Sequence, residues 1–140
     1  MNGKALVREL GEALGVELEM SGRNTCGVFF DEDEVVFEMH GGHLYVMADI
    51  GPAAGRKDAH TRLLEADCLG AESGQACIGL DAQREVFTLH RILEGELTSE
   101  EFANVMTLFI RALRYWKEWL ARPASEQAER ASFVPNGIWA

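Results

Sequence analysis

Cysteine is scarce in this chain, and its few cysteines form no motif. Cys26, Cys68 and Cys77 include no Cys-x-x-Cys pair and have no partner ligand close in sequence. Zinc sites need thiolate or imidazole ligands on short spacers, so we expect no structural zinc. Because the count is odd and each cysteine lies in apolar or strand-like sequence, we expect reduced thiols that pack as small hydrophobes. A reducing compartment follows from this.

Positive charge is also in short supply. The chain has 13 lysines and arginines against 23 aspartates and glutamates, which is a formal net charge of −10. This charge repels nucleic-acid phosphates and anionic membrane surfaces, so we expect neither as a partner. A basic or neutral partner is favoured. The same charge would keep a protein with apolar grooves in solution, although solubility alone is also a sufficient explanation.

Long apolar runs are missing as well. No stretch of the sequence approaches the roughly 18 apolar residues that a membrane span needs. The first nine residues contain Lys4, Arg8 and Glu9 and lack the uninterrupted apolar centre of a signal peptide. We therefore expect no membrane contact and a cytoplasmic location.

Motifs for catalysis or cofactor binding are absent or weak. There is no nucleophile-elbow pattern, and residues 51–57 precede a helix without Walker or dinucleotide spacing. The four carboxylates of residues 31–34 lack the spacers and the glycine of a calcium loop, so we interpret them as a charged turn. We expect no cofactor, no metal and no enzyme activity.

Histidines leave one alternative open, an enzyme or small-ligand sensor with a pocket near His40, His43 or His60. The first two flank a Gly-Gly turn, and on a tight hairpin their side chains could point to the same side. Cys68 or Cys77 could also meet a histidine in space as a nucleophile-base pair. Nothing in the sequence selects any such pair.

The strands are predicted by alternating apolar residues between turn signals. Apolar residues make up 47% of the chain and charged residues 26%, as in an ordinary globular domain. The first three strands should form an antiparallel meander, with Gly41-Gly42 as a tight hairpin turn. The fifth is partly apolar on both faces, which favours a central place in the sheet. The five predicted strands are residues 26–30, 34–40, 43–50, 76–81 and 84–93.

Three helices are predicted by apolar residues at three- and four-residue spacings. The first covers residues 4–14 and ends at Gly15. The second begins with Asp58 as its N-cap and carries apolar residues as far as Leu69. The third begins with a capping box of Thr98 and Glu101 and ends before a proline. Its stripe should place Phe109, Leu113 and Trp116 in the core.

The predicted fold class is therefore α+β, in the order α-β-β-β-α-β-β-α, with helices packed on an antiparallel sheet. Residues 1–122 form the domain, and residues 123–140 form a tail. The tail carries a short apolar patch at residues 133–139, and one hypothesis is that this patch docks into an apolar groove as a placeholder for a partner.

The run Leu63-Leu64-Glu65-Ala66-Asp67-Cys68-Leu69-Gly70, continuing to Ile78-Gly79-Leu80-Asp81, carries a resemblance to a known family. A leucine-rich helix, a Leu-Gly, a second glycine and an apolar strand ending in Leu-Asp resemble the central signature of the class I type III secretion chaperones of the Tir-chaperone (CesT-like) type. The opening helix, the strand at residues 85–91 and the aromatic helix at 109–119 are similar to that family in the same order. The family often has asparagine where Asp67 stands.

The resemblance implies a homodimeric, secretion-specific chaperone. Such a protein holds the unfolded N-terminal segment of a secreted effector and keeps it soluble and secretion-competent without ATP. An extended partner can add a strand to an open sheet edge while apolar pockets take alternate side chains. For effector binding the resemblance implies Val7, Leu10, Leu14, Val28, Phe30 and Val36. For the dimer interface it implies Leu63, Leu64, Leu69, Ile78 and Leu80. For each of these residues, ordinary core packing is the competing interpretation.

A second function class remains open at this stage. A chaperone-like domain of this kind could instead be a regulatory or immunity-type protein that sequesters a partner. Its partner would then be a folded domain rather than an extended segment.

Overall fold

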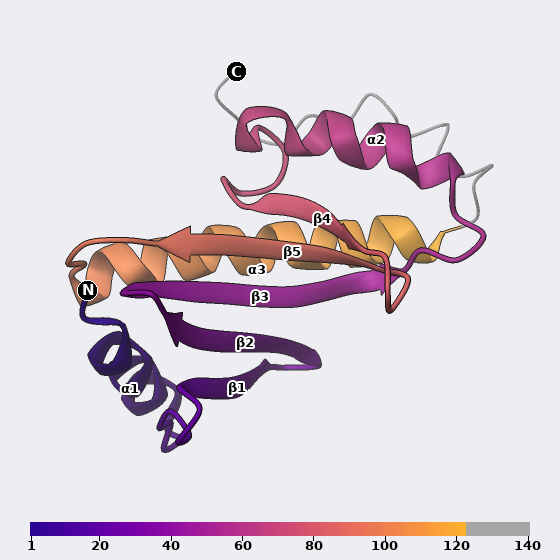
Figure 1. Ribbon diagram of the computed structural model, residues 1–140. Coiled ribbons are helices and arrows are strands. Elements are labelled where there is room, and N and C mark those ends of the chain that lie inside the picture. Colours follow the sequence, from indigo (N-terminus) through magenta and orange to yellow (C-terminus); the bar gives the residue numbers. More distant parts are fainter. Residues whose placement is uncertain (123–140) are drawn as a thin grey trace. The chain divides into compact units, whose positions relative to one another are not determined.

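The structure is a computed structural model that describes residues 1–122. In chain order (Figure 1) its elements are α1 (Gly3–Leu14), β1 (Thr25–Phe30), β2 (Asp33–His40), β3 (His43–Pro52), α2 (Asp58–Asp67), the 3-10 turn η1 (Cys68–Gly70), β4 (Cys77–Asp81), β5 (Val86–Leu93) and α3 (Ser99–Ala121). The predicted succession of helices and strands is confirmed, with η1 added after the second helix. The predicted tail and its docking lie outside the described residues.

The five strands form one antiparallel sheet in the order β1-β2-β3-β5-β4. β5 is an interior strand between β3 and β4, in agreement with its two-sided apolar pattern, and β1 and β4 are the edge strands. The chain divides into two compact units. Among the described residues, unit 1 comprises Met1–Ala48 and Arg91–Thr107, and unit 2 comprises Asp49–His90 and residues 108–122. Residues of β3, β5 and α3 belong to both.

The meander in unit 1 follows the predicted hairpins. β1 pairs with β2 in a register that sets Val28 opposite Val35, and β2 pairs with β3 across a turn at Gly41 and Gly42. Both glycines have positive φ, at 58° and 80°, which is the requirement of the tightest hairpin turns. On the inner face Phe37 is fully buried, and its ring lies 6.0 Å from that of Phe102 in α3.

α1 packs against this meander by one face, beside β1 and β2 (Figure 1). Leu6 and Val7 are buried, and a Cβ at Gly3 would lie 2.4 Å from the Met39 sulfur, so the helix approaches β2 closely at its start. The helix ends at Gly15, as predicted, because that residue is left-handed with φ of 74°.

In unit 2 the second helix differs from the prediction at both ends. Lys57 already has helical backbone angles and Asp58 is the first helical residue, so the expected N-cap role of Asp58 is wrong. Its carboxylate instead accepts a hydrogen bond from Arg56 Nε at 3.1 Å. Leu69 lies beyond the helix in η1, because its φ of 56° and the left-handed Gly70 turn the chain away.

α3 begins at the predicted capping box. Glu101 N–H donates to Thr98 Oγ1 at 3.1 Å, and Thr98 N–H donates to the Glu101 carboxylate at 2.8 Å. The three residues assigned to the core from sequence are all buried, which confirms the apolar stripe: Phe109, Leu113 and Trp116.

Candidate functional site

Unit 1 carries the first candidate surface, on α1 and the edge strand β1. The six residues implied for effector binding differ in exposure. Val7 and Val28 are buried at 0% and 4%, so they support the surface from beneath. Leu14 is 45% exposed. Leu10, Phe30 and Val36 are half-buried. Burial does not test binding, and the roles of all six stay predictions.

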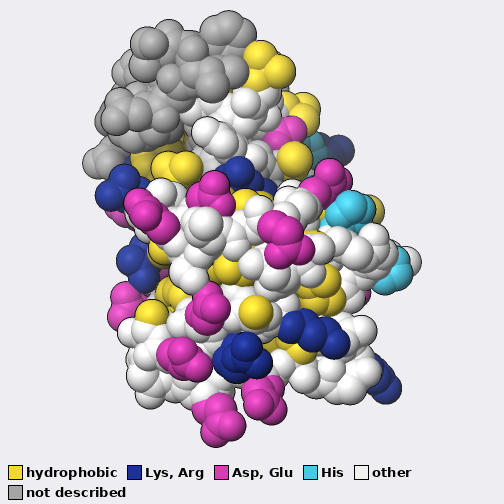
Figure 2. All heavy atoms as spheres, turned by 90° about the vertical axis from the view of Figure 1, so that its left-hand side faces the viewer, with side chains coloured by type: hydrophobic (Ala, Val, Ile, Leu, Met, Phe, Trp, Pro, Cys, Tyr) yellow, Lys and Arg dark blue, Asp and Glu magenta, His cyan; other side chains and the backbone are white. Residues whose placement is uncertain are grey.

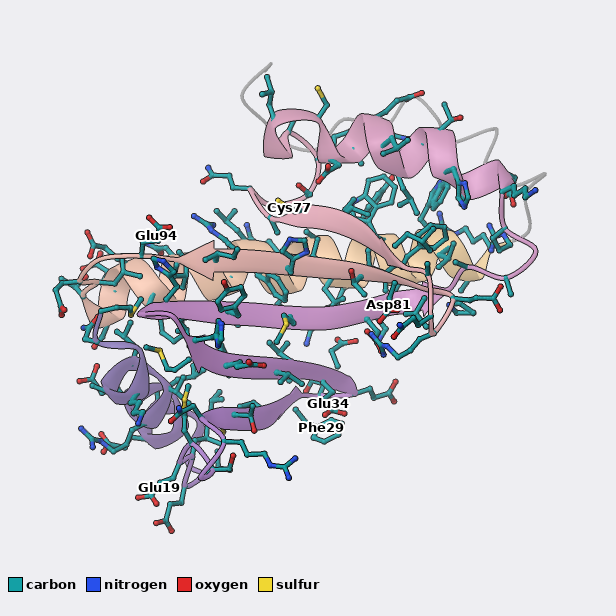
Figure 3. The ribbon with its side chains drawn as sticks, in the orientation of Figure 1. Glu19, Phe29, Glu34, Cys77, Asp81 and Glu94 are labelled. Carbon is teal, nitrogen blue, oxygen red and sulfur yellow. The ribbon has the colours of Figure 1, made fainter. Side chains whose placement is uncertain are left out.

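Phe29 is the residue that the sequence interpretation missed. It is 67% exposed on β1, whereas its neighbours Val28 and Phe30 turn to the covered side. The register sets Phe29 opposite Glu34 of β2, and Figure 3 shows both side chains at the end of the strands where the hairpin turns. The acidic partner was the available signal, because cross-strand neighbours share a face of the sheet and a glutamate marks the solvent face.

The backbone of β1 is open along part of its free edge. Met39 N–H donates to the Asn24 carbonyl at 2.9 Å, one step beyond the Thr25↔Glu38 pair. Because antiparallel hydrogen-bonded and non-bonded pairs alternate, Gly27 and Phe29 must point their N–H and C=O groups away from β2. At Thr25 the edge is closed, since the Ser21 N–H donates to its carbonyl at 2.8 Å.

Within the described residues, the outward groups of Gly27 and Phe29 have no backbone partner. The one nearby donor is the Cys26 thiol, at 4.0 Å from the Gly27 carbonyl oxygen. Burial raises the pKa of that thiol, which favours its protonated form, the form that can donate. An edge with unpaired backbone groups and an exposed aromatic residue is a template for a further strand.

The outer face of the same meander is partly apolar. Val36 lies opposite Gly27 on one side and opposite Met47 of β3 on the other, so these residues share the outer face. Val36 and Met47 are half-buried. Glu34 and Glu38 flank Val36 on this face, so the surface combines apolar and acidic side chains.

Acidic side chains also lie over α1 and the loop that follows it, in the lower part of Figure 2, with basic and small apolar areas between them. Glu9, Glu12, Glu17 and Glu19 are the exposed acidic residues of this stretch. Unit 1 therefore presents a negative potential to a partner that approaches β1 or α1.

Unit 2 carries a second candidate surface, between α2 and the hairpin of β4 and β5. An open, mostly apolar hollow of about 150 Å³ is lined by His60, Leu63, Leu64, Ile78, Gly79, Leu80 and Phe87. Four of the five residues implied for the dimer interface are therefore brought together. Leu64 is 69% and Leu80 51% exposed, whereas Leu63 is buried at 2% as the floor. Leu69 is 66% exposed but lies in η1, outside the hollow.

A network of polar contacts fixes the chain between α2 and β4. The Asp67 carboxylate accepts a hydrogen bond from Ile78 N–H at 2.7 Å, which ties the end of α2 to the start of β4. Arg62 makes a bidentate pair with Glu72, with contacts of 2.7 and 2.5 Å, and its guanidinium lies 5.2 Å from the centre of the Trp116 ring. These contacts tie the end of α2, the turn after it and the start of β4 to one another.

The histidines considered for an enzyme or sensor pocket are dispersed among structural contacts. His43 Nδ1 lies 3.7 Å from the Glu94 carboxylate, His40 packs edge-on to Tyr45, and His60 packs edge-on to Phe87. Residues 1–122 contain no group of three or more side chains placed to bind a metal ion. No helix in the described part of the chain is long and apolar enough to span a membrane.

Comparison of the whole chain with solved structures shows the fold clearly. The chain is similar to a chain of the HopA1–SchA chaperone–effector complex (TM-score 0.71, 16% identity, covering 83% of this chain and 93% of that chain). It is also similar to a chain of the ExsC–ExsE complex (0.70, 15%, 84% and 92%). A third is in the heterodimeric ExoU–SpcU complex of the type III secretion system of Pseudomonas aeruginosa (0.65, 13%, 82% and 94%).

A search of curated protein sequences gave no significant match. The sequence model of the Tir chaperone protein (CesT) family, in contrast, matches residues 5–117, which is most of the chain and all elements from α1 into α3. The resemblance found in the residues around Leu63–Asp81 is thereby confirmed. The chain belongs to the Tir chaperone protein (CesT) family.

Proposed function

We propose that this protein is a type III secretion chaperone that binds the N-terminal segment of a secreted effector in extended form and keeps it soluble and secretion-competent. The family match supports this function, as do the similar chains in the HopA1–SchA chaperone–effector complex and in the ExoU–SpcU complex of a type III secretion system. The alternative, sequestration of a folded partner, is not favoured by these comparisons.

The observation that carries the proposal is the open edge of β1. An extended segment can satisfy its own backbone by pairing with Gly27 and Phe29, and it can place apolar side chains on the neighbouring surface. Backbone groups that leave water need hydrogen-bond partners, and an open strand edge supplies them to a segment that stays extended.

The accessible members of the predicted set supply the apolar contacts. We assign Leu10 and Leu14 of α1, Phe30 of β1 and Val36 of β2 to this surface, together with Phe29. Val7 and Val28 act from below, by holding α1 and β1 in place. Enlarging or truncating them would change the surface indirectly.

The hollow in unit 2 is proposed as the homodimer interface. Leu64, Leu69 and Leu80 are large, apolar and more than half exposed, which is costly in a protein that stays monomeric. A two-fold interface uses the same patch on both copies, so an exposed leucine of one copy can enter the hollow of the other. We also propose that the protein acts without catalysis, because holding a segment requires binding alone. Its place of action would be the cytoplasm, where the effector is held before export.

The test is to express the tagged chain in its native host, identify the captured protein, and co-express only that protein's N-terminal segment. We expect a stable complex in which the segment resists protease only where the chaperone covers it and shows no folded core of its own when released. Capture of a partner that resists protease equally well when free would contradict the proposal, since that partner would be a folded domain.

An uncharged substitution at the proposed surface tests the site, and the same kind of substitution on β5 is its matched control. Phe29→Ser should weaken the complex about tenfold or more, because removing an exposed aromatic anchor typically costs 2 kcal/mol or more at an interface centre. Ile92→Ser, at a residue that is 45% exposed on β5, should leave affinity nearly unchanged. Equal losses for both variants would argue against a site at β1.

A further inference from the structure

Along the edge strand β1, the row of side chains on the outer face of the sheet has a gap. Gly27 lies between Thr25 and Phe29 on the outer face, and a Cβ built on it would meet only one atom within 4 Å, the Glu34 Oε1 at 3.5 Å. The Glu34 carboxylate therefore borders this gap.

The floor of the gap is apolar and its sides are acidic. Val36 is the direct register partner of Gly27, and Glu34 and Glu38 stand two residues away on either side of Val36 along β2. Neither carboxylate makes a hydrogen bond or ion pair with another described residue. The gap thus offers uncompensated negative charge around a small apolar floor.

The length of a basic side chain suits this arrangement. A lysine or arginine can lay its methylene stem on an apolar floor and carry its charge to carboxylates at the rim. On an added strand, the residue opposite Gly27 would be separated from Val36 of β2 by β1 alone. A long basic side chain reaches across β1 at the glycine, whereas an aspartate or glutamate at that position would face carboxylates of like charge.

The neighbouring position on the added strand has a different requirement. The residue two places along, opposite Phe29, lies on the same outer face because side chains alternate. Phe29 is 67% exposed, so an apolar partner side chain would remove its ring from water.

We infer that the β1 edge is selective for an extended segment that places a lysine or arginine opposite Gly27, against Glu34 and Glu38, and an apolar residue two positions away, opposite Phe29. This inference rests on the proposed function, since it specifies which segments that edge accepts. The net charge of −10 adds a long-range attraction for such a segment, but it cannot by itself choose a position.

The experiment is selection of a displayed library of random 12-residue peptides on the wild-type protein and two charge-reversal variants in parallel. Glu34→Arg changes the gap, and Glu19→Arg makes the same change of net charge in the exposed loop after α1, away from Phe29 and Glu34 (Figure 3). Wild type and Glu19→Arg should enrich a basic residue with an apolar residue two positions away. Glu34→Arg should lose the basic preference.

Selected peptides then allow a binding measurement that needs no altered protein. Replacing the enriched basic residue by glutamate should weaken binding to the wild type about fivefold in low salt, the order expected for an exposed ion pair. Gly27→Pro removes the outward N–H and also adds ring carbons beside the gap, so it should weaken every selected peptide about tenfold. The β1–β2 ladder should stay intact, because the Gly27 N–H does not bond to β2. Circular dichroism would check that each variant stays folded.

Three results would overturn the inference. They are no common pattern on the wild type, the same basic preference on Glu34→Arg, or an equal loss of that preference on Glu19→Arg, which would mean that net charge alone attracts. If any of these occurs while an effector segment still co-purifies with the protein, the chaperone function stands and only the selectivity of β1 fails. If no segment co-purifies, the proposed function fails whatever the library selects.

Discussion

Arg62 has the densest set of contacts among the charged side chains of α2. It pairs with Glu72 through two hydrogen bonds, lies over the Trp116 ring, and is within 3.7 Å of Glu65. Trp116 Nε1 donates to the Glu72 carbonyl at 2.7 Å, so one loop residue is held by both its side chain and its backbone. The Glu72 pair raises the pKa of Arg62 above its already high usual value.

Arg62→Met should destabilise the protein by about 2–4 kcal/mol. The Glu72 carboxylate, only 10% exposed, would lose both charged hydrogen bonds and remain without compensation. Urea unfolding followed by tryptophan fluorescence measures the change. Arg62→Met combined with Glu72→Met should recover part of the loss, since both charges are then removed. A single variant as stable as wild type would show that the pair contributes nothing.

A second arginine, Arg84, is exposed, and it affects the pKa of the Asp81 carboxylate rather than the packing of the core. It donates hydrogen bonds to the carboxylates of Asp81 and Asp49 at 2.8 to 3.0 Å. The hydrogen bond from Arg84 lowers the pKa of Asp81 below its usual 3.8. Because the folded-state pKa is the lower one, the carboxylate stabilises the fold above 3.8, and this contribution is lost as the pH falls through the folded pKa.

Arg84→Met should raise the pKa of Asp81 toward its usual value, because the side-chain hydrogen bond from Arg84 is the largest cause of the lowering. A titration of the Asp81 carboxyl carbon by nuclear magnetic resonance measures this directly. The stability difference between wild type and variant should shrink as the pH is lowered below 3.8. A pKa that stays depressed in the variant would assign the effect to the Asp81 turn, where the Gln83 and Arg84 N–H groups also donate to this carboxylate.

At the scale of elements, the connection from α2 to β4 depends on reversals of the backbone. Leu69, Gly70, Gly74 and Gln75 all have positive φ, which folds η1 and the following turn against the end of α2. Ser73 is fully buried and donates its hydroxyl to the Ala76 carbonyl at 2.5 Å. Such a compact turn leaves little space for side chains, and it places Leu80 and Ile78 beside the helix.

Gly74→Ala should be among the most damaging small substitutions in the protein. A Cβ there would lie 2.5 Å from the Leu108 carbonyl oxygen of α3, and the residue has φ of 63°. Both the clash and the left-handed backbone oppose alanine, so we expect a loss of more than about 2 kcal/mol by urea unfolding.

Gly55→Ala is the matched control for this prediction. Gly55 has a similar φ of 71°, but a Cβ there would meet nothing within 4 Å. The Gly55→Ala variant should lose only the roughly 1–2 kcal/mol of stability that a left-handed backbone costs a residue with a Cβ. Equal losses at both positions would mean that the contact with α3 relaxes without cost.

At the scale of the whole molecule, charge and exposed apolar surface act in opposition. A net charge of −10 keeps copies apart at long range, while Leu64, Leu69 and Leu80 favour association at short range. Salt screens the first effect and not the second, so association should strengthen as salt is added.

Leu64→Asp with Leu80→Asp should convert the proposed homodimer into a folded monomer. Each change puts a charge into an interface that would otherwise be desolvated, while both side chains are more than half exposed in the single chain. Light scattering coupled to size-exclusion chromatography measures the mass. As a control, the Leu14→Asp variant, which is changed at an exposed position of α1, should remain dimeric. A wild-type monomer, or a variant that remains a dimer, would exclude the hollow as the interface.

The sequence alone was sufficient for the order of elements, the capping box at Thr98 and the family. These depend on local periodicity, turn glycines and spacing, which are properties of neighbouring residues. It placed Asp58 wrongly as a cap, because its pairing with Arg56 could not be distinguished from capping without coordinates.

Which apolar residues of β1 and α2 reach the surface was decided only by the tertiary structure. Alternation divides β1 into two faces, but tertiary packing determines that Val28 is buried and Phe29 is exposed. The open edge at Gly27 and the hollow beside Leu64 likewise arise from strand order and from the turn after α2. The exposure of a side chain depends on which distant segments cover it, and a local sequence pattern does not identify those segments.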